Sequence, residues 1–104
     1  SLHDALPIWR SGWGAYAVSK FATEGMMQVL AEEYKNRNLR VNCINPGGTR
    51  TKMRASAFPE EDAGKLKTPA EIMPIYLYLM GDDSRRKTGV SFDAQPGRKP
   101  GPAE

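Results

Sequence analysis

Helical and strand-like segments alternate along this chain. Apolar residues recur at helical spacing from 14 to 34, and a second helical segment runs from 68 to residue 80 or 81. Each is followed by a short apolar run of strand length, at 39–44 and at 90–94. Strands that alternate with helices pair in parallel, because the helix returns the chain to the same end of the sheet. The sequence therefore predicts an α/β fold in the order helix, strand, loop, helix, strand.

The second helix has a clear beginning. Thr68 can cap its first turn, Pro69 suits the first helical position, and Glu71 completes a capping box. Pro74 lies further along the helix, where it removes one backbone donor. We therefore expect a bend at Pro74.

Two strands are too few for a stable sheet, so further strands must come from the same protein or from a partner. We expect residues 10–104 to be a C-terminal fragment of a larger α/β domain. We expect residues 1–9 to be a non-native leader, because 1–8 match the translation of a common sequencing adapter, although a natural loop is the alternative. Residues 95–104 hold three prolines and two glycines and are expected to form an extended tail.

Composition excludes several classes of protein. The chain of 104 residues is 39% hydrophobic, and no run reaches the roughly 18 apolar residues of a membrane helix. The net charge of +3 is mild, and its basic residues are mixed with acidic ones, which argues against a nucleic-acid surface. Cys43 and His3 are the only residues of their types, which excludes an internal disulfide and a Cys- or His-based metal site. A single cysteine fits the reducing cytoplasm.

Tyr16 and Lys20 are four residues apart on the first helix, so their side chains share one face. A tyrosine hydroxyl becomes a useful base when a nearby cation stabilises its phenolate. At about 5 Å and an effective dielectric constant near 20, an ammonium attracts a phenolate by roughly 3 kcal/mol. Such a tyrosine can act as general acid in reducing a carbonyl, or as general base in oxidising an alcohol. The spacing alone also occurs by chance, so an ordinary amphipathic helix face is the alternative.

The sequence Asn-Pro-Gly-Gly-Thr-Arg-Thr (45–51) ends the first strand abruptly. In open α/β sheets, ligands bind beyond the carboxyl ends of the strands. Gly47 and Gly48 would let the backbone approach a ligand closely, because they have no side chain. Thr49 and Thr51 could offer hydroxyl or backbone groups to a carboxamide or a phosphate. A plain strand-ending turn is the alternative.

A long polar loop follows at 49–67, with a short helix expected around 53–57. Loops of this length in compact domains are usually lids, binding loops or disordered segments. The basic residues Arg50, Lys52 and Arg54 could meet an acidic substrate or a cofactor phosphate, or they could belong to a solvated polar loop.

The Tyr-Ala-Val-Ser-Lys motif (16–20) and the Pro-Gly-Gly-Thr turn, in this order and spacing, resemble the short-chain dehydrogenase/reductase family. The stretches 13–16, 19–25, 40–51 and 93–100 are most similar to the bacterial YciK-type oxidoreductases of that family. The resemblance implies a Rossmann-like doubly wound parallel sheet, of which this chain holds a truncated C-terminal portion.

The family's activity then becomes the expectation for the parent protein. The resemblance implies an NAD(P)-dependent oxidoreductase that transfers hydride between NAD or NADP and a small-molecule carbonyl or alcohol. Tyr16 matches the family's catalytic acid/base. Lys20 matches the lysine that assists the tyrosine and holds the nicotinamide ribose.

The resemblance also implies a set of cofactor contacts. Pro46 and Gly47 match the Pro-Gly motif beside the nicotinamide, and Thr51 matches the threonine that follows it. Thr49 lies where backbone groups meet the carboxamide. The implied cofactor site of this chain is Tyr16, Lys20, Pro46, Gly47, Thr49 and Thr51.

Other features follow from the resemblance. The segment after Thr51 would be the substrate-binding lid, and the helix at 14–34 would pack against a second subunit in a homo-oligomer. The family's glycine-rich dinucleotide loop and the residue that selects NAD or NADP are not found, and His3 stands near the place of the catalytic serine. We therefore expect the chain by itself to be inactive. A non-catalytic binding or scaffold domain that uses the long helix for subunit contact is the alternative.

Overall fold

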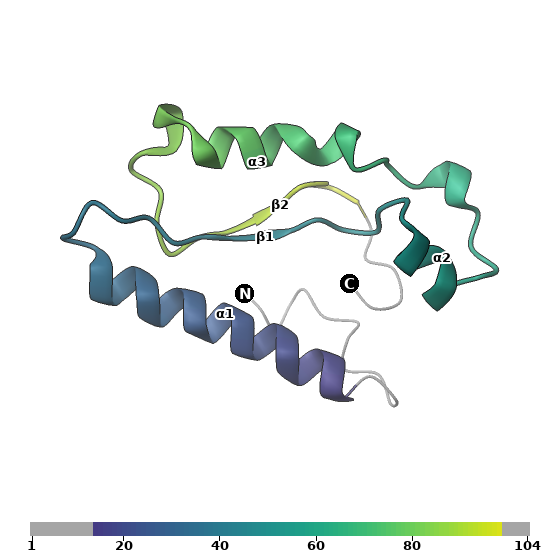
Figure 1. Cartoon of the computed structure of the whole chain (residues 1–104), viewed down its shortest axis with the longest axis horizontal. Helices are drawn as coiled ribbons and strands as arrows, with labels where there is room; N and C mark the ends of the chain where they lie inside the picture. Colours follow the sequence, from purple (N-terminus) through teal and green to yellow (C-terminus); the bar gives the residue numbers. More distant parts are fainter. Residues whose placement is uncertain (1–13, 99–104) are drawn as a thin grey trace.

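The computed structural model describes residues 14–98. These residues form three layers, of which the middle one is a pair of parallel strands. Helix α1 lies on one face of the pair and helix α3 on the other, as Figure 1 shows. The expected leader at 1–9 and residues 99–104 of the expected tail lie outside the described residues. The elements are α1 (Gly14–Tyr34), β1 (Cys43–Asn45), α2 (Lys52–Ala57), α3 (Met73–Met80) and β2 (Ser91–Asp93), with short 3-10 turns at 63–65, 70–72 and 82–84. The predicted α/β order is confirmed.

The two strands pair in parallel, with Cys43 opposite Ser91 and Asn45 opposite Asp93. Both are shorter than the sequence predicts. Upstream of β1, side chains take the place of some backbone partners, since Val41 N donates to Thr88 Oγ1 at 3.1 Å. A side chain also accepts from the backbone at Val90, whose N–H donates to the side-chain oxygen of Asn42 at 3.1 Å. Two backbone donors of this region are thus taken by side chains, whereas Gly89 N donates to the backbone oxygen of Val41 at 2.8 Å.

Helix α1 has the bounds that its apolar spacing predicts. Its inner face buries Ala17, Met27 and Ala31. Gln28 donates a hydrogen bond to Gly89 O at 3.0 Å, which ties the helix to the segment before β2. After the helix, Asn38 adopts a left-handed conformation (φ 56°), which asparagine tolerates better than most residues, and the chain reverses toward β1.

The capping box before α3 is present. Thr68 N donates to Glu71 Oε1 at 3.0 Å, and Glu71 N donates back to Thr68 Oγ1 at 3.3 Å. The expected bend inside the helix is wrong, because the α-helix begins only at Met73 and Pro74 lies in its first turn. A proline there loses no hydrogen bond, because first-turn donors have no partner within the helix.

Both helices leave apolar surface uncovered within the described residues. On α1, Val18, Met26 and Val29 are 68%, 60% and 56% exposed, on the side opposite the buried residues. On α3, Leu77 is 64% exposed, and Tyr78 meets Phe92 of β2 edge to face with ring centroids 6.4 Å apart. The described part of the chain therefore buries few apolar side chains and has two apolar outer faces.

Candidate active site

The inner face of α1 carries the two residues that the sequence singled out. Lys20 Nζ lies 5.2 Å from the centre of the Tyr16 ring, so the pair predicted from spacing is in contact. Tyr16 is half-buried and Lys20 is exposed. The first turns of α1 and the carboxyl end of β1 lie at the same end of the molecule, next to α2 (Figure 1).

Glu24 extends this polar row by one further turn, a role that the sequence analysis missed. Ser91 of β2 donates a short hydrogen bond to Glu24. The pKa of Cys43 in β1 is raised, first by burial and then by the charge of Glu24, while Lys20 acts in the opposite direction. Glu24 therefore ties α1 to β2, and its charge acts on Cys43 of β1. Its spacing of four from Lys20 was the available sign.

The turn after β1 is held by its own side chains. Gly47 has a positive φ of 71°, which a residue with a side chain rarely adopts. Its N–H donates to the side-chain oxygen of Asn45 at 3.2 Å, and its carbonyl accepts from the hydroxyl of Thr49 at 2.9 Å. The turn is thus fixed locally at its centre.

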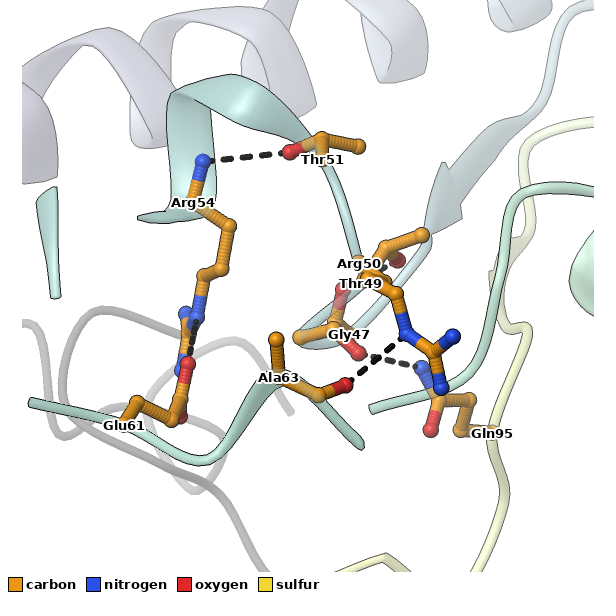
Figure 2. A network of polar contacts seen from close by, with 9 residues as sticks. Gly47, Thr49, Arg50, Thr51, Arg54, Glu61, Ala63 and Gln95 are labelled. Atoms are coloured by element: carbon orange, nitrogen blue, oxygen red, sulfur yellow. Dashed lines mark hydrogen bonds and ion pairs between the residues drawn. The ribbon is translucent and has the colours of Figure 1, made fainter. Parts of the chain in front are cut away.

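A distant residue completes the turn. Gln95 Nε2 donates to Pro46 O at 3.0 Å and to Gly48 O at 2.9 Å. Figure 2 shows the Gln95 side chain directed at this turn. All three carbonyls from 46 to 48 then accept hydrogen bonds, whereas none of the bonds recorded among residues 14–98 uses the N–H of Gly48 or Thr49. Gly48 is buried and Thr49 is half-buried, so the turn presents the Thr49 N–H, which suits an acceptor such as a carboxamide oxygen.

Thr51 begins helix α2. Its hydroxyl oxygen accepts from Arg54 N at 3.1 Å, as an N-capping residue does. The hydroxyl keeps its own hydrogen for a second contact. The structure therefore places Thr51 at the junction between the turn and the loop that follows.

Arg50 fastens the base of the loop at 49–67, which we call the lid. Its guanidinium donates to Ala63 O at 2.9 Å, Leu66 O at 3.3 Å and Gly64 O at 3.4 Å. Its backbone N–H donates to Lys67 O at 2.8 Å, so the two ends of the lid are joined. Figure 2 shows Arg50 reaching across to Ala63.

Arg54 folds the tip of the lid. Its guanidinium donates to both carboxylate oxygens of Glu61, at 2.8 and 2.9 Å, and lies 4.2 Å from the centre of the Phe58 ring. The hydrogen bond from Arg54 lowers the pKa of Glu61. Arg50 and Arg54 therefore hold the lid together, a role that the sequence did not predict, and Arg50 is also exposed to solvent. Lys52 is exposed.

Residues 14–98 contain no group of three acidic, histidine or cysteine side chains arranged to hold a metal ion. None of the helices in the same range is long and apolar enough to cross a membrane.

Comparison with known proteins identifies the class. Residues 8–62 match the sequence model of the short chain dehydrogenases. This match covers more than half of the chain and includes the Tyr16–Lys20 pair and the Pro-Gly turn. The chain belongs to the short-chain dehydrogenase/reductase family.

Among its relatives is the Escherichia coli K12 oxidoreductase YciK, which is 83% identical over 92 residues, covering 88% of this chain and 36% of that protein. A short-chain dehydrogenase structure from Shigella flexneri is 83% identical, with a TM-score of 0.84, and covers 88% of this chain and 36% of its own. Another from Escherichia coli CFT073, solved with NADPH, is 82% identical with a TM-score of 0.79 over 84% of this chain and 36% of its own. The chain thus spans about a third of the length of these relatives, and the predicted similarity to YciK-type oxidoreductases is confirmed.

The lid is expected to open more easily without its ion pair. We consider a chimera in which residues 10–104 of this chain replace the matching segment of Escherichia coli YciK, called the YciK chimera below. Glu61→Gln in this chimera removes the charged acceptor of Arg54 and should cost about 1 kcal/mol, a roughly fivefold rise in lid opening. Amide hydrogen exchange across 52–61 measures the opening. Glu60→Gln, at the exposed neighbouring carboxylate, is the matched control, and equal exchange in both variants would contradict the assignment.

Acid should have the same effect on the lid. The pKa of Glu61 is lowered in the folded chain, so its pairing stabilises the lid above the usual carboxyl range and is lost as the pH falls through the lowered value. The Glu60→Gln chimera should therefore lose lid protection on acidification, relative to its exchange at neutral pH after correction for intrinsic rates. The Glu61→Gln chimera should lose less. Parallel pH profiles would count against the pairing.

Proposed function

We propose that this chain contributes the catalytic tyrosine, its lysine and the nicotinamide-facing turn of an NADP(H)-dependent oxidoreductase that interconverts a carbonyl and an alcohol. The observation that carries the proposal is the contact of Lys20 with the Tyr16 ring, 5.2 Å from its centre. The pair lies in the first two turns of α1, on the helix face that buries Ala17, and these turns are at the end of the molecule where β1 terminates (Figure 1). Ligands of open α/β sheets bind at that end.

Tyr16 acts on the substrate oxygen. In the reducing direction the cofactor supplies a hydride to the carbonyl carbon. The Tyr16 hydroxyl donates its proton to the carbonyl oxygen, which leaves a phenolate and yields the alcohol. The ammonium of Lys20 stabilises that phenolate, although solvent screens an exposed lysine. In the oxidising direction the phenolate takes the proton back from the alcohol.

The remaining residues suit the nicotinamide end of the cofactor. The N–H of Thr49 is a donor for the carboxamide oxygen, while Lys20 can donate to a ribose hydroxyl. Pro46 and Gly47 shape the turn, and Thr51 offers its hydroxyl hydrogen. This end is common to NAD and NADP, so our choice of NADP(H) rests on the Escherichia coli relative solved with NADPH. The proposal places the protein in the cytoplasm, where such cofactors are available.

We also propose that the outer face of α1 contacts a second copy of the protein. Val18, Met26 and Val29 form an exposed apolar row along this face. Gly25 lies in the same row, and a Cβ added there would meet nothing within 4 Å. A glycine in a helix permits close approach of a second helix, which offsets its cost of about 1 kcal/mol in helix propensity. The same row is what a scaffold domain without catalytic activity would use.

Replacing Tyr16 separates the enzyme from the scaffold. Tyr16→Phe in the YciK chimera removes the proton donor and should lower NADPH oxidation with a panel of aldehydes and ketones by about 100-fold or more. The dissociation constant of NADPH should change little, because the substituted hydroxyl serves chemistry more than cofactor affinity. Tyr34→Phe, in the last turn of the same helix, is the matched control. Unchanged turnover in the Tyr16→Phe variant would leave only the scaffold function.

A charge on the outer face of α1 should disrupt the proposed subunit contact. Val29→Glu in the YciK chimera places a carboxylate in the apolar row, and burying it unpaired in an interface is costly. Sedimentation velocity should show a smaller species than the unmodified chimera. Thr23→Glu adds the same charge on the flank of the helix and should leave the oligomer intact. A Val29→Glu chimera that keeps its oligomeric state would contradict the contact.

The 104-residue chain alone should not bind NADPH in saturable fashion at micromolar concentration. The family's glycine-rich loop, which holds the diphosphate, has no counterpart that we find in this sequence. Titration followed by tryptophan fluorescence measures the binding, and the YciK chimera provides the positive control. Saturable micromolar binding by the chain alone would show that its own residues suffice.

A further inference from the structure

Gln95, which is far from the turn after β1 in sequence, binds that turn with its side chain. Its single amide nitrogen donates to two carbonyl oxygens, Pro46 O at 3.0 Å and Gly48 O at 2.9 Å. The two acceptors lie on either side of Gly47, so one side chain spans the turn. A backbone N–H of β2 could not bond both carbonyls of the turn, because the backbone N–H groups of that strand are directed at β1.

The position of Gln95 is set by the strand pairing. Asn45 and Asp93 are the last paired residues of β1 and β2, and Ala94 N continues the pairing to Asn45 O at 2.9 Å. The side chains of Asn45 and Asp93 also meet, with Asn45 Nδ2 donating to Asp93 Oδ1 at 3.2 Å. Gln95 is the next residue, and Arg98 N donates to its carbonyl at 3.2 Å. These backbone hydrogen bonds on both sides of Gln95 thus fix its position next to the turn.

By binding the carbonyls of the turn, Gln95 also fixes the direction of the N–H groups that follow them. In a trans peptide the N–H of one residue is directed opposite to the C=O of the residue before it. Because the Gly48 carbonyl faces Gln95, the Thr49 N–H faces away from it. No bond recorded among residues 14–98 takes up this N–H. Gln95 therefore orients the donor that the proposed function assigns to the nicotinamide carboxamide.

The Gln95 side chain also packs closely against Gly47. A Cβ added there would lie 3.1 Å from Gln95 Nε2 and 3.4 Å from its side-chain carbonyl carbon. The positive φ of Gly47 and the closeness of Gln95 both exclude a larger residue. The two residues form one fitted unit.

We propose that Gln95 is a positioning residue of the cofactor site, which holds the Pro46 and Gly48 carbonyls so that the Thr49 N–H faces the nicotinamide carboxamide. The inference rests on the proposed function, and it adds to that function a residue 49 positions after Pro46. Its effect is confined to the nicotinamide end of the cofactor, so it predicts a loss of affinity for that end alone.

The test compares two ligands in the YciK chimera. NADPH contains the nicotinamide, whereas 2′-phospho-ADP-ribose is the same molecule without it. Gln95→Met is neutral and of similar length but donates no hydrogen bond, so it should weaken NADPH binding about tenfold, as expected for one or two lost contacts. The dissociation constant of 2′-phospho-ADP-ribose should change by less than about twofold, because this ligand has no nicotinamide to contact the turn. Isothermal titration calorimetry gives both dissociation constants.

Gln28→Met is the matched control, because Gln28 also donates to a backbone carbonyl far away in sequence, Gly89 O at 3.0 Å. It should leave the ratio of the two dissociation constants unchanged. If Gln95→Met does not yield folded protein, Gln95→Asn keeps the donor on a shorter arm and should raise the ratio to a smaller extent. An unchanged ratio, or equal weakening of both ligands, would overturn the positioning role. An unmodified chimera that binds neither ligand would instead overturn the proposed function on which the role depends.

Discussion

The parallel register of β1 and β2 is the constraint on which the rest of the site depends. With Asn45 opposite Asp93, both strands end at the same edge, and the segments that follow them meet there. The turn at 46–48 and Gln95 can touch only because of this register. A slip of one residue would direct each side chain to the opposite face of the sheet. The side-chain bonds of Asn42 and Thr88 upstream lock the pairing before the short ladder begins.

Helix α1 serves two purposes along one face. Near its beginning this face carries Tyr16, Lys20 and Glu24, which are polar, and near its end it carries Met27 and Ala31, which are buried. The apolar half fixes the helix against the sheet, and the contact between Glu24 and Ser91 sits at the boundary between the halves. The Tyr16–Lys20 pair is thus carried on a helix that is anchored further along its length, an arrangement that holds side chains accurately.

The sequence predicted what depends on neighbours along the chain. Helix α1, the capping box at Thr68 and the Tyr16–Lys20 pair follow from spacing over three or four residues, and the structure contains them. The strand ends could not be predicted, because side chains from distant segments take the backbone donors there. Gln95 and the carbonyl contacts of Arg50 were missed for the same reason. Their partners become neighbours only once the sheet has formed.

The closed base of the lid separates the shape of its tip from the geometry of the turn. Arg50 collects carbonyls from 63–66, and its backbone is bonded to Lys67, so the two ends stay together whatever lies between them. The tip, where Arg54 pairs with Glu61, is a second unit with its own contacts. Residues can therefore be inserted, deleted or exchanged in the tip at low entropic cost while the base stays closed. This is a modular construction, in which sequence changes confined to the tip leave the turn at 46–48 undisturbed.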